Sequence, residues 1–262
     1  MSDRPNPTPI VFVDADNTLW DTDRVFAEAQ LALLDAVEQA TALNAPATDR
    51  LAFVRSLDQG LAERHHEGLR YPPKLLIRAL AAVLAGEKGP RAVRAALSGS
   101  GEERLHLEVS AAIEQAFFTA LRQPPMLREG VAAGLAALSK AKATVLIITE
   151  GARARIERTT AGFGLTDHVT RIVEGAKRPD LYRRVLRLTN GADAAFMIGD
   201  QLDRDIAPAK AAGVETIYFP GGFQPRWLPG IDTVGPDHVI ASFDEVPGIV
   251  LRGRLQGRAA AA

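Results

Sequence analysis

IVFVDADNTLWD, residues 10–21, joins a short apolar run to three carboxylates. Residues 10–13 are β-branched or aromatic at every position, which predicts a short and fully buried strand. Asp14 and Asp16 come next, so we expect them where that strand leaves the core. Two anions so close repel one another unless a cation or a shared proton offsets their charge. The segment therefore predicts a buried strand that ends in functional carboxylates.

Composition limits the possible classes of protein. The chain has 262 residues, of which 47% are hydrophobic and 24% charged, enough to bury one large core or two modest ones. A formal net charge of -1 without a long basic run argues against a nucleic-acid surface. The absence of cysteine excludes thiol nucleophiles, disulfides and Cys-based zinc sites, and it fits a reducing compartment.

Location is predicted from hydropathy along the chain. The first residues, MSDRPNPTP, are polar and rich in proline, unlike the apolar core of a signal peptide. The apolar runs are too short to span a membrane. We therefore expect a cytoplasmic protein that binds neither nucleic acid nor membrane.

The segment 23–122 has a helical pattern throughout. Apolar residues recur at helical spacing over 26–37 and over 109–121. Ser100 and Glu103 are spaced as a capping box for the second of these helices. This segment is therefore expected to form an all-α insertion.

From residue 124 onward, strand and helix patterns alternate. Buried strands are predicted at 143–149, 168–173, 194–199 and 214–219. Helices are predicted near 152–163, 180–189 and 205–212, the last ended by Gly213. Such alternation predicts an α/β fold with a Rossmann-like parallel sheet, which the strand at 10–13 would join. We expect a core of residues 1–21 and 124–262 and a helical cap of residues 22–123.

The strand ends gather polar side chains. In open parallel sheets, ligand sites lie at the carboxyl ends of the strands. Asp14 and Asp16 follow one strand, Thr149 another and Asp200 a third, while Lys177 precedes a helix. We expect these residues to converge on one edge of the sheet.

Other well-known sites do not match this sequence. An EF-hand loop would need Gly and Glu where the chain has Leu19 and Val25. The chain has no phosphate-binding P-loop, no dinucleotide fingerprint and no serine nucleophile elbow. Its five histidines show no metal-ligand spacing, which favours solvated or locally bonded roles for them.

Four separated motifs together resemble the haloacid dehalogenase-like (HAD) superfamily of phosphohydrolases. In chain order they are D-x-D-x-T at Asp14, Asp16 and Thr18, an apolar strand ending in Thr149, Lys177 before a helix, and G-D with D-I at Gly199-Asp200 and Asp205-Ile206. The four motifs extend over nearly the whole chain. The helical segment resembles the cap that many members carry after their first motif.

The resemblance implies a Mg²⁺-dependent hydrolase of a small phosphorylated metabolite. Asp14 would be the nucleophile that forms an aspartyl-phosphate, and Asp16 the general acid and base. Asp14, the backbone carbonyl of Asp16, and Asp200 would bind Mg²⁺, while Asp205 would orient metal-bound water. Asp205 also fits the N-cap of the helix predicted at 205–212.

The same resemblance implies a phosphate side of the site. Thr149 and nearby backbone N–H groups, such as that of Gly151, would hold the phosphoryl oxygens, and Lys177 would neutralise charge. Arg178 is an alternative to Lys177, because it directly precedes Pro179. Thr18 fits phosphate contact and turn capping equally well.

Specificity is expected from the cap. Its segment 64–74 contains Tyr71, which either contacts substrate or belongs to a surface loop between helices. Glu150 replaces the usual Asn of the second motif, and its carboxylate is unfavourable beside a phosphate unless it points away. Asp16 favours phosphoryl transfer, because dehalogenases of the superfamily generally lack it. A phosphomutase and a catalytically idle phosphate-binding module are the alternatives, and we expect a monomer or homodimer.

Overall fold

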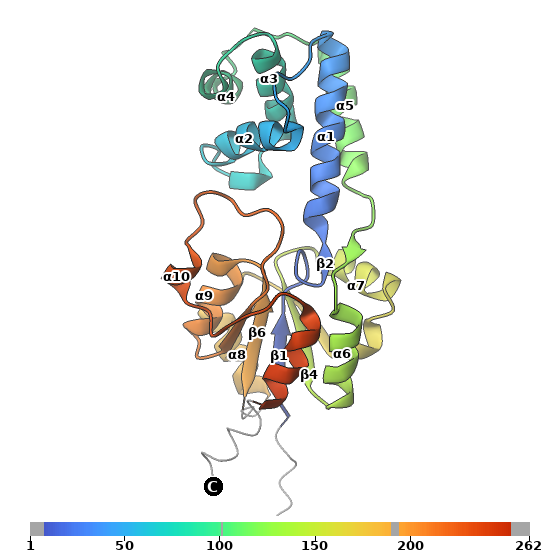
Figure 1. Cartoon of the computed structure of the whole chain (residues 1–262), viewed down its shortest axis with the longest axis vertical. Helices are drawn as coiled ribbons and strands as arrows, with labels where there is room; N and C mark the ends of the chain where they lie inside the picture. The colour runs from blue at the N-terminus through green and yellow to red at the C-terminus, as the bar shows by residue number, and fades with distance from the viewer. Residues whose placement is uncertain (1–7, 101, 190–193, 253–262) are drawn as a thin grey trace, which may run out of the picture. The chain divides into compact units, whose positions relative to one another are not determined.

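The chain divides into two compact units (Figure 1). A computed structural model describes residues 8–100, 102–189 and 194–252. The α/β unit is formed by the chain up to Asp23, by Pro125–Gln224 and by the chain from Leu228. The helical unit is formed by Arg24–Pro124 together with Pro225–Trp227. These divisions lie beside those predicted after residues 21 and 123, and the function of the helical unit as a cap stays a prediction.

No helix within the described residues is long and apolar enough to cross a membrane. Most of the N-terminal segment discussed above, residues 1–7, lies outside the described part of the chain. The expected cytoplasmic location stays a prediction.

The predicted parallel α/β fold is confirmed. Six parallel strands lie in the order β5-β4-β1-β6-β7-β8. Their bounds are β1 Ile10–Val13, β4 Thr144–Thr149, β5 Arg171–Glu174, β6 Ala195–Gly199, β7 Glu215–Tyr218 and β8 His238–Val239. The strand at 10–13 is central, and Val13 pairs in register with Ile147 on one side and Ile198 on the other.

Helices cover both faces of this sheet (Figure 1). Val11 and Val13 pack with α6 (Val131–Lys140) and α7 (Arg153–Gly162). Ile10 and Phe12 point to the other face, toward α8 (Pro179–Leu188) and α9 (Ala207–Lys210). Because successive side chains of a strand point to opposite faces, a strand covered on both faces is apolar throughout.

Some boundaries differ from the predictions. The strand predicted at 168–173 begins only at Arg171, because Thr166–His168 form a 3₁₀ turn, η2. The helix predicted at 205–212 consists of a π-helical turn, η3 (Leu202–Ile206), followed by α9. Helix α6, strand β8 and the short antiparallel pair β2 (Trp20–Asp21) and β3 (Met126–Leu127) were not predicted. The remaining elements are α10 (Ile231–Val234), η4 (Phe243–Glu245) and a helix over 246–252.

The helical unit has its own apolar core. Its helices are α1 (Thr22–Thr41, which begins in the α/β unit), α2 (Arg50–Ala62), η1 (Gly68–Arg70), α3 (Pro73–Leu84), α4 (Gly89–Ser98) and α5 (Leu107–Ala120). The helices predicted over 26–37 and 109–121 are thereby confirmed. The predicted capping box of Ser100 and Glu103 is wrong, because α5 starts four residues after Glu103. Glu103 instead accepts a hydrogen bond from Arg78 of α3.

A contact between α6 and η4 gives a stability prediction. A Cβ added to Gly134 would lie 2.6 Å from Cδ1 of Phe243 and 2.8 Å from its carbonyl oxygen. Gly134→Ala should therefore destabilise the fold by about 1–3 kcal/mol, although alanine favours helices by about 1 kcal/mol. At Gly162, the last residue of α7, no neighbouring atom of residues 8–100, 102–189 or 194–252 lies within 4 Å of such a Cβ. Gly162→Ala is the matched control, and urea unfolding should show no loss; an equal loss would contradict the packing argument.

Candidate active site

Two carboxylates come together at the ends of two adjacent parallel strands. Asp14 follows β1 and Asp200 follows β6, and the backbone N–H of Asp14 donates to the carbonyl oxygen of Ile198 at 2.9 Å. The Asp14 residue is 6% exposed and Asp200 1%. The parallel register thus brings together two acids that lie 186 positions apart in the chain.

Asp205 supplies a third carboxylate from η3. One ligand oxygen from each of Asp14, Asp200 and Asp205 lies within 4.8 Å of the others. The second carboxylate oxygen of Asp205 accepts from the backbone N–H of Gln201 at 2.9 Å. The predicted N-cap role of Asp205 for the following helix is wrong, because the chain is already helical at 202–206 and Ile206 occupies the cap position of α9.

Lys177 bridges two of these acids. Its ammonium group donates to the Asp14 carboxylate and, at 2.6 Å, to Oδ1 of Asp205. Its side chain is only 7% exposed, whereas the neighbouring Arg178 is exposed at the N-cap of α8. Of the two cations that the sequence offered, the structure therefore brings Lys177 to the acids.

Burial and the charges of neighbouring groups shift the pKa values of the groups in this cluster. Burial raises the pKa of Asp14 to about 7, against the opposing effect of Lys177. Burial also raises the pKa of Asp200, and the neighbouring Asp14 and Asp205 add to the effect. Burial alone would lower the pKa of Lys177, but Asp14 and Asp205 raise it above its ordinary value. The lysine is thus held charged by carboxylates that repel one another.

Thr18 lies among the acids and is fully buried. Its hydroxyl lies 3.2 Å from Oδ2 of Asp14 and 3.5 Å from Oδ1 of Asp200. A hydroxyl has a single hydrogen to donate, so it serves one of these acceptors at a time. Thr18 therefore tethers the turn after β1 to the acidic cluster.

Asp16 points to a different set of partners. Its Oδ1 accepts from Nε1 of Trp20 and from Nη1 of Arg155, each at 2.9 Å, and its Oδ2 accepts from Nη2 of Arg155. The Asp16 carboxylate does not belong to the metal-type cluster of Asp14, Asp200 and Asp205 among the described residues. Asp16 is thus paired with Arg155 and Trp20, whereas Asp14 and Asp205 are paired with Lys177.

The second motif contributes a hydroxyl and an accommodating glycine. The hydroxyl of Thr149, at the end of β4, accepts from the backbone N–H of Gly151 at 3.0 Å. A Cβ at Gly151 would lie 2.7 Å from Nη2 of Arg155, so glycine leaves room for that guanidinium.

Glu150 is bound by other groups. Its carboxylate accepts from Arg204 and, at 3.3 Å, from the backbone N–H of Lys177. Partial burial would raise the pKa of Glu150, but Arg204 and this N–H lower it overall. The negative charge of Glu150, which we expected to be unfavourable beside a phosphate, is therefore offset by Arg204.

Tyr71 belongs to the helical unit. Its side chain is buried and its hydroxyl donates to the Asp58 carboxylate. Burial raises the pKa of Tyr71 above its ordinary value, and Asp58 adds to this. These contacts tie the end of the segment 64–74 to α2, and substrate contact by Tyr71 stays a prediction.

The sequence analysis missed two residues that hold the loops of the site. Asn17 has a φ of 59°, and its side-chain oxygen accepts from the Thr22 hydroxyl at 2.8 Å and from the Asp23 N–H at 2.7 Å. Arg128 donates to the carbonyl oxygens of Asn17 and, at 2.8 Å, Pro220. A D-N dipeptide is a turn signal that indicates the first role. The role of Arg128 joins segments that are far apart in the chain, so no local sequence pattern indicates it.

The acidic cluster fits a divalent cation. Oδ2 of Asp200 is buried and has no hydrogen-bond partner within the described residues. A Cβ at Gly221, in the loop after β7, would lie 2.6 Å from this oxygen, so the glycine keeps its surroundings open. Buried carboxylate oxygens are the ligands that a hard cation such as Mg²⁺ prefers.

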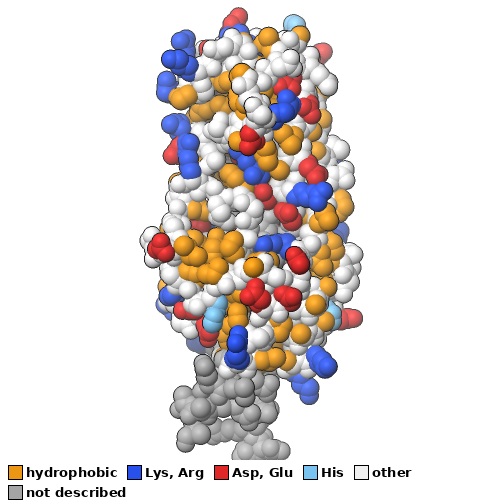
Figure 2. All heavy atoms as spheres, viewed as in Figure 1, with side chains coloured by type: hydrophobic (Ala, Val, Ile, Leu, Met, Phe, Trp, Pro, Cys, Tyr) orange, Lys and Arg blue, Asp and Glu red, His pale blue; other side chains and the backbone are white. Residues whose placement is uncertain are grey.

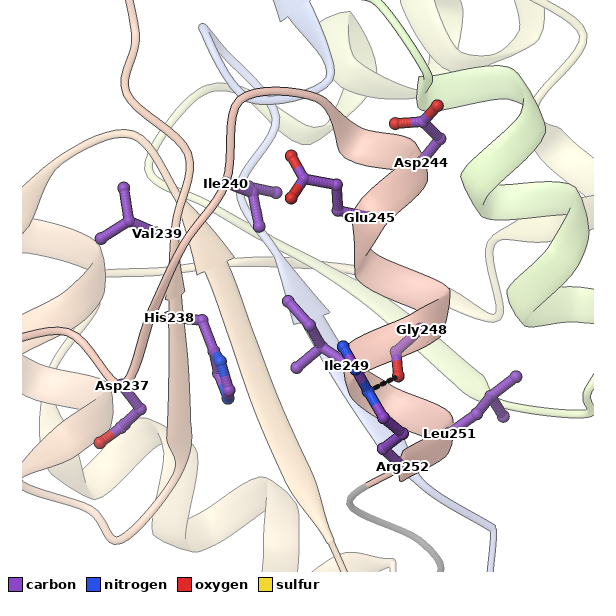
Figure 3. A pocket seen from close by; sticks show the side chains of 10 residues that line it. All are labelled: Asp237, His238, Val239, Ile240, Asp244, Glu245, Gly248, Ile249, Leu251 and Arg252. Carbon is purple, nitrogen blue, oxygen red and sulfur yellow. Dashed lines mark hydrogen bonds between the residues drawn. The ribbon is translucent and has the colours of Figure 1, made fainter.

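A pocket elsewhere in the α/β unit holds no comparable group of metal-binding side chains among the residues that the structure describes. The pocket in Figure 3 is lined by β8, η4 and the helix over 246–252. Its Asp237 accepts from the N–H of Thr216 at 2.8 Å, and its Glu245 accepts from the N–H of Ser242 at 3.0 Å. Both carboxylates thus accept from backbone N–H groups.

On the molecular face seen in Figure 2, basic and acidic side chains are interspersed, in agreement with the net charge of -1.

The comparisons with known proteins agree with this geometry. Residues 8–213 match the haloacid dehalogenase-like hydrolase family. The chain therefore belongs to the haloacid dehalogenase-like hydrolases. No curated protein matches it.

Solved structures share the fold over almost the whole chain. A haloacid dehalogenase-like family hydrolase from Xanthomonas campestris is 21% identical with a TM-score of 0.63, covering 97% of this chain and 99% of that one. A HAD family hydrolase from Deinococcus radiodurans, with bound phosphate and sodium, is 20% identical with a TM-score of 0.62, covering 95% and 98%. The HAD-hydrolase YfnB from Bacillus subtilis, bound to magnesium, is 19% identical with a TM-score of 0.59, covering 93% and 99%.

The raised pKa values predict how stability depends on pH. A carboxyl whose pKa is higher in the folded than in the unfolded state costs stability as the pH rises from the unfolded to the folded value, because over that range the folded chain binds more protons than the unfolded one. Asp14 and Asp200 are both such groups, and the folded pKa of Asp14 alone predicts that the metal-free protein loses stability between about pH 4 and pH 7. Asp200→Asn removes one repelling anion and should raise Tm in chelator at pH 8 by about 2–5 °C.

The comparison needs an exposed acid as its control. Asp167→Asn changes an exposed carboxylate in η2 and should leave Tm nearly unchanged at both pH values. Thermal unfolding should show the Asp200→Asn gain shrinking toward pH 5. A gain that is absent at pH 8, or as large at pH 5, would contradict the charge-repulsion account.

Proposed function

We propose that the protein is a Mg²⁺-dependent phosphatase that hydrolyses a small phosphorylated metabolite through an aspartyl-phosphate on Asp14. The observation that carries the proposal is that the carboxylates lie in two separate environments. Asp14, Asp200 and Asp205 form a buried cluster with Lys177, while Asp16 is held apart by Arg155 and Trp20. A nucleophile and an acid with separate surroundings are what stepwise phosphoryl transfer requires.

Asp14 is suited to attack. Its position after β1 fixes the backbone, and Lys177 and Thr18 contact its two oxygens. One of these oxygens would bond to phosphorus while the ester oxygen leaves. The anionic form is the nucleophile, and Lys177 favours it against the effect of burial.

Asp16 would move the proton twice. It would first donate a proton to the leaving ester oxygen, so that the product leaves as an alcohol. The resulting carboxylate would then take a proton from the water that attacks phosphorus, which releases phosphate and regenerates Asp14. Both steps balance without another reagent.

The remaining groups would bind the charges. Asp14, Asp200 and the backbone carbonyl of Asp16 would hold Mg²⁺, which would offset the carboxylates and polarise the phosphoryl group. Asp205 would keep Lys177 in place beside Asp14. The Thr149 hydroxyl accepts from Gly151 and retains its own hydrogen to donate to a phosphoryl oxygen.

Two of the similar structures support this choice. The Deinococcus radiodurans hydrolase carries bound phosphate, and the Bacillus subtilis hydrolase carries magnesium. The presence of Asp16 favours phosphoryl transfer over dehalogenation, because only the former needs an acid for the leaving oxygen.

Activity should depend on Mg²⁺ and on Asp14. A panel of phosphorylated metabolites should show phosphate release with Mg²⁺ and none with chelator, restored by added Mg²⁺. Asp14→Asn should abolish release without unfolding the protein, because the amide and the carboxylate have nearly the same shape. Full activity in chelator, or in a folded Asp14→Asn protein, would refute the proposal. Transfer of phosphate back to the substrate instead of its release would identify a mutase.

The role of Asp16 has a separate signature. Asp16→Asn should slow turnover about a hundred-fold or more with a poor leaving group, the usual scale of acid–base catalysis. The loss should be smaller with 4-nitrophenyl phosphate, whose leaving group needs little protonation. Steady-state kinetics on the two kinds of substrate measure this, and equal losses would assign Asp16 to metal binding or structure.

A further inference from the structure

Arg155, which lies outside the four motifs, forms hydrogen bonds with both carboxylate oxygens of Asp16, the proposed acid. Its Nη1 donates to Oδ1 of Asp16 at 2.9 Å, and its Nη2 donates to Oδ2. Trp20 adds a third hydrogen bond, from Nε1 to Oδ1 at 2.9 Å. Both oxygens of the carboxylate are therefore held, in a planar fork that a lysine could not form.

The local structure directs Arg155 to this position. Ile156, the next residue of α7, is fully buried in the core of the α/β unit and fixes the rotation of the helix. Gly151 leaves the space that Nη2 occupies, because its Cβ would lie 2.7 Å from that atom. The Arg155 side chain itself is 42% exposed, so apolar packing does not explain its place.

Its neighbour on the helix has a different environment. Arg153 donates to Glu157 one turn along α7 at 2.6 Å, and both side chains are exposed. Two arginines of the same helix turn are thus distinguished by their partners. The contact of Arg155 with Asp16 is specific.

We propose that Arg155 is a positioning residue that fixes the Asp16 carboxylate in the orientation needed for proton transfer. The inference rests on the proposed function. A lone aspartate after a strand has free rotation about two side-chain bonds, whereas a bidentate guanidinium and the Trp20 indole restrict both. Proton transfer requires the acid within hydrogen-bond distance of the leaving oxygen, so small displacements are costly.

The inference predicts a leaving-group signature. Without Arg155, the Asp16 carboxyl group is still present but loses the bidentate contact that orients it. The loss should fall on substrates whose leaving oxygen needs protonation, and it should appear in kcat more than in KM. A residue that only supports the fold, or that binds the substrate phosphate, would slow good and poor leaving groups alike.

The experiment compares Arg155→Met and Arg155→Lys with the matched control Arg153→Met. On phenyl phosphate, Arg155→Met should lower kcat by about 10- to 100-fold. On 4-nitrophenyl phosphate the loss should be several-fold smaller, and Arg155→Lys should lie between wild type and Arg155→Met on both substrates. Arg153→Met should behave as wild type. Equal losses on the two substrates, or a change confined to KM, would overturn the inference.

A spectroscopic measurement tests the contact independently of turnover. The chain has two tryptophans, and the indole N–H signal of Trp20 in a ¹⁵N-resolved NMR spectrum reports on its bond to Asp16. Arg155→Met should shift or broaden this signal, as Asp16→Asn should, while the Trp227 signal should remain unchanged. An unmoved Trp20 signal would refute the positioning role. If wild type releases no phosphate, the proposed function fails, whereas the Trp20 signal still decides whether Arg155 holds Asp16.

Discussion

The site depends on one interaction, the ion pairing of the Lys177 ammonium group with both Asp14 and Asp205. Asp14 and Asp205 both accept from the buried Lys177, and Asp200 lies beside them with one oxygen that has no hydrogen-bond partner in the described part of the chain. Three buried carboxylates and one ammonium leave a net negative charge, and burial of uncompensated charge is costly. The cluster therefore favours an additional cation. Burial, together with repulsion among these carboxylates, raises the pKa values of Asp14 and Asp200 in the metal-free protein.

The backbone around the cluster is arranged so that the acids fit. Gly199 is required beside Asp205, because a Cβ there would lie 2.4 Å from its side chain. Arg128 donates to carbonyl oxygens on both sides, at Asn17 after β1 and at Pro220 after β7. It thereby ties the turn that carries the first motif to the loop that passes Asp200. Charge and loop geometry are thus fixed by the same few side chains.

The features that the sequence predicts are those with a local or periodic cause. The strand Ile10–Val13 was predicted residue for residue, because a strand buried on both faces must be apolar throughout. The meeting of Asp14 and Asp200 followed from the parallel sheet. The capping role of Asp205 was wrong, since the π-helical turn η3 begins three residues earlier. Arg155 was missed because its partner lies 139 positions away, and a basic residue on a helix has many possible roles.

The most direct test of the account is detection of the covalent intermediate on Asp14. The protein would be mixed with a phosphorylated substrate and Mg²⁺, quenched in acid within a single turnover and digested for mass spectrometry. The account predicts one phosphoryl group on the peptide that contains Asp14, absent with chelator and absent in Asp14→Asn. Substrate turnover with no phosphorylated Asp14 peptide at any quench time, or phosphate on a different residue, would contradict it.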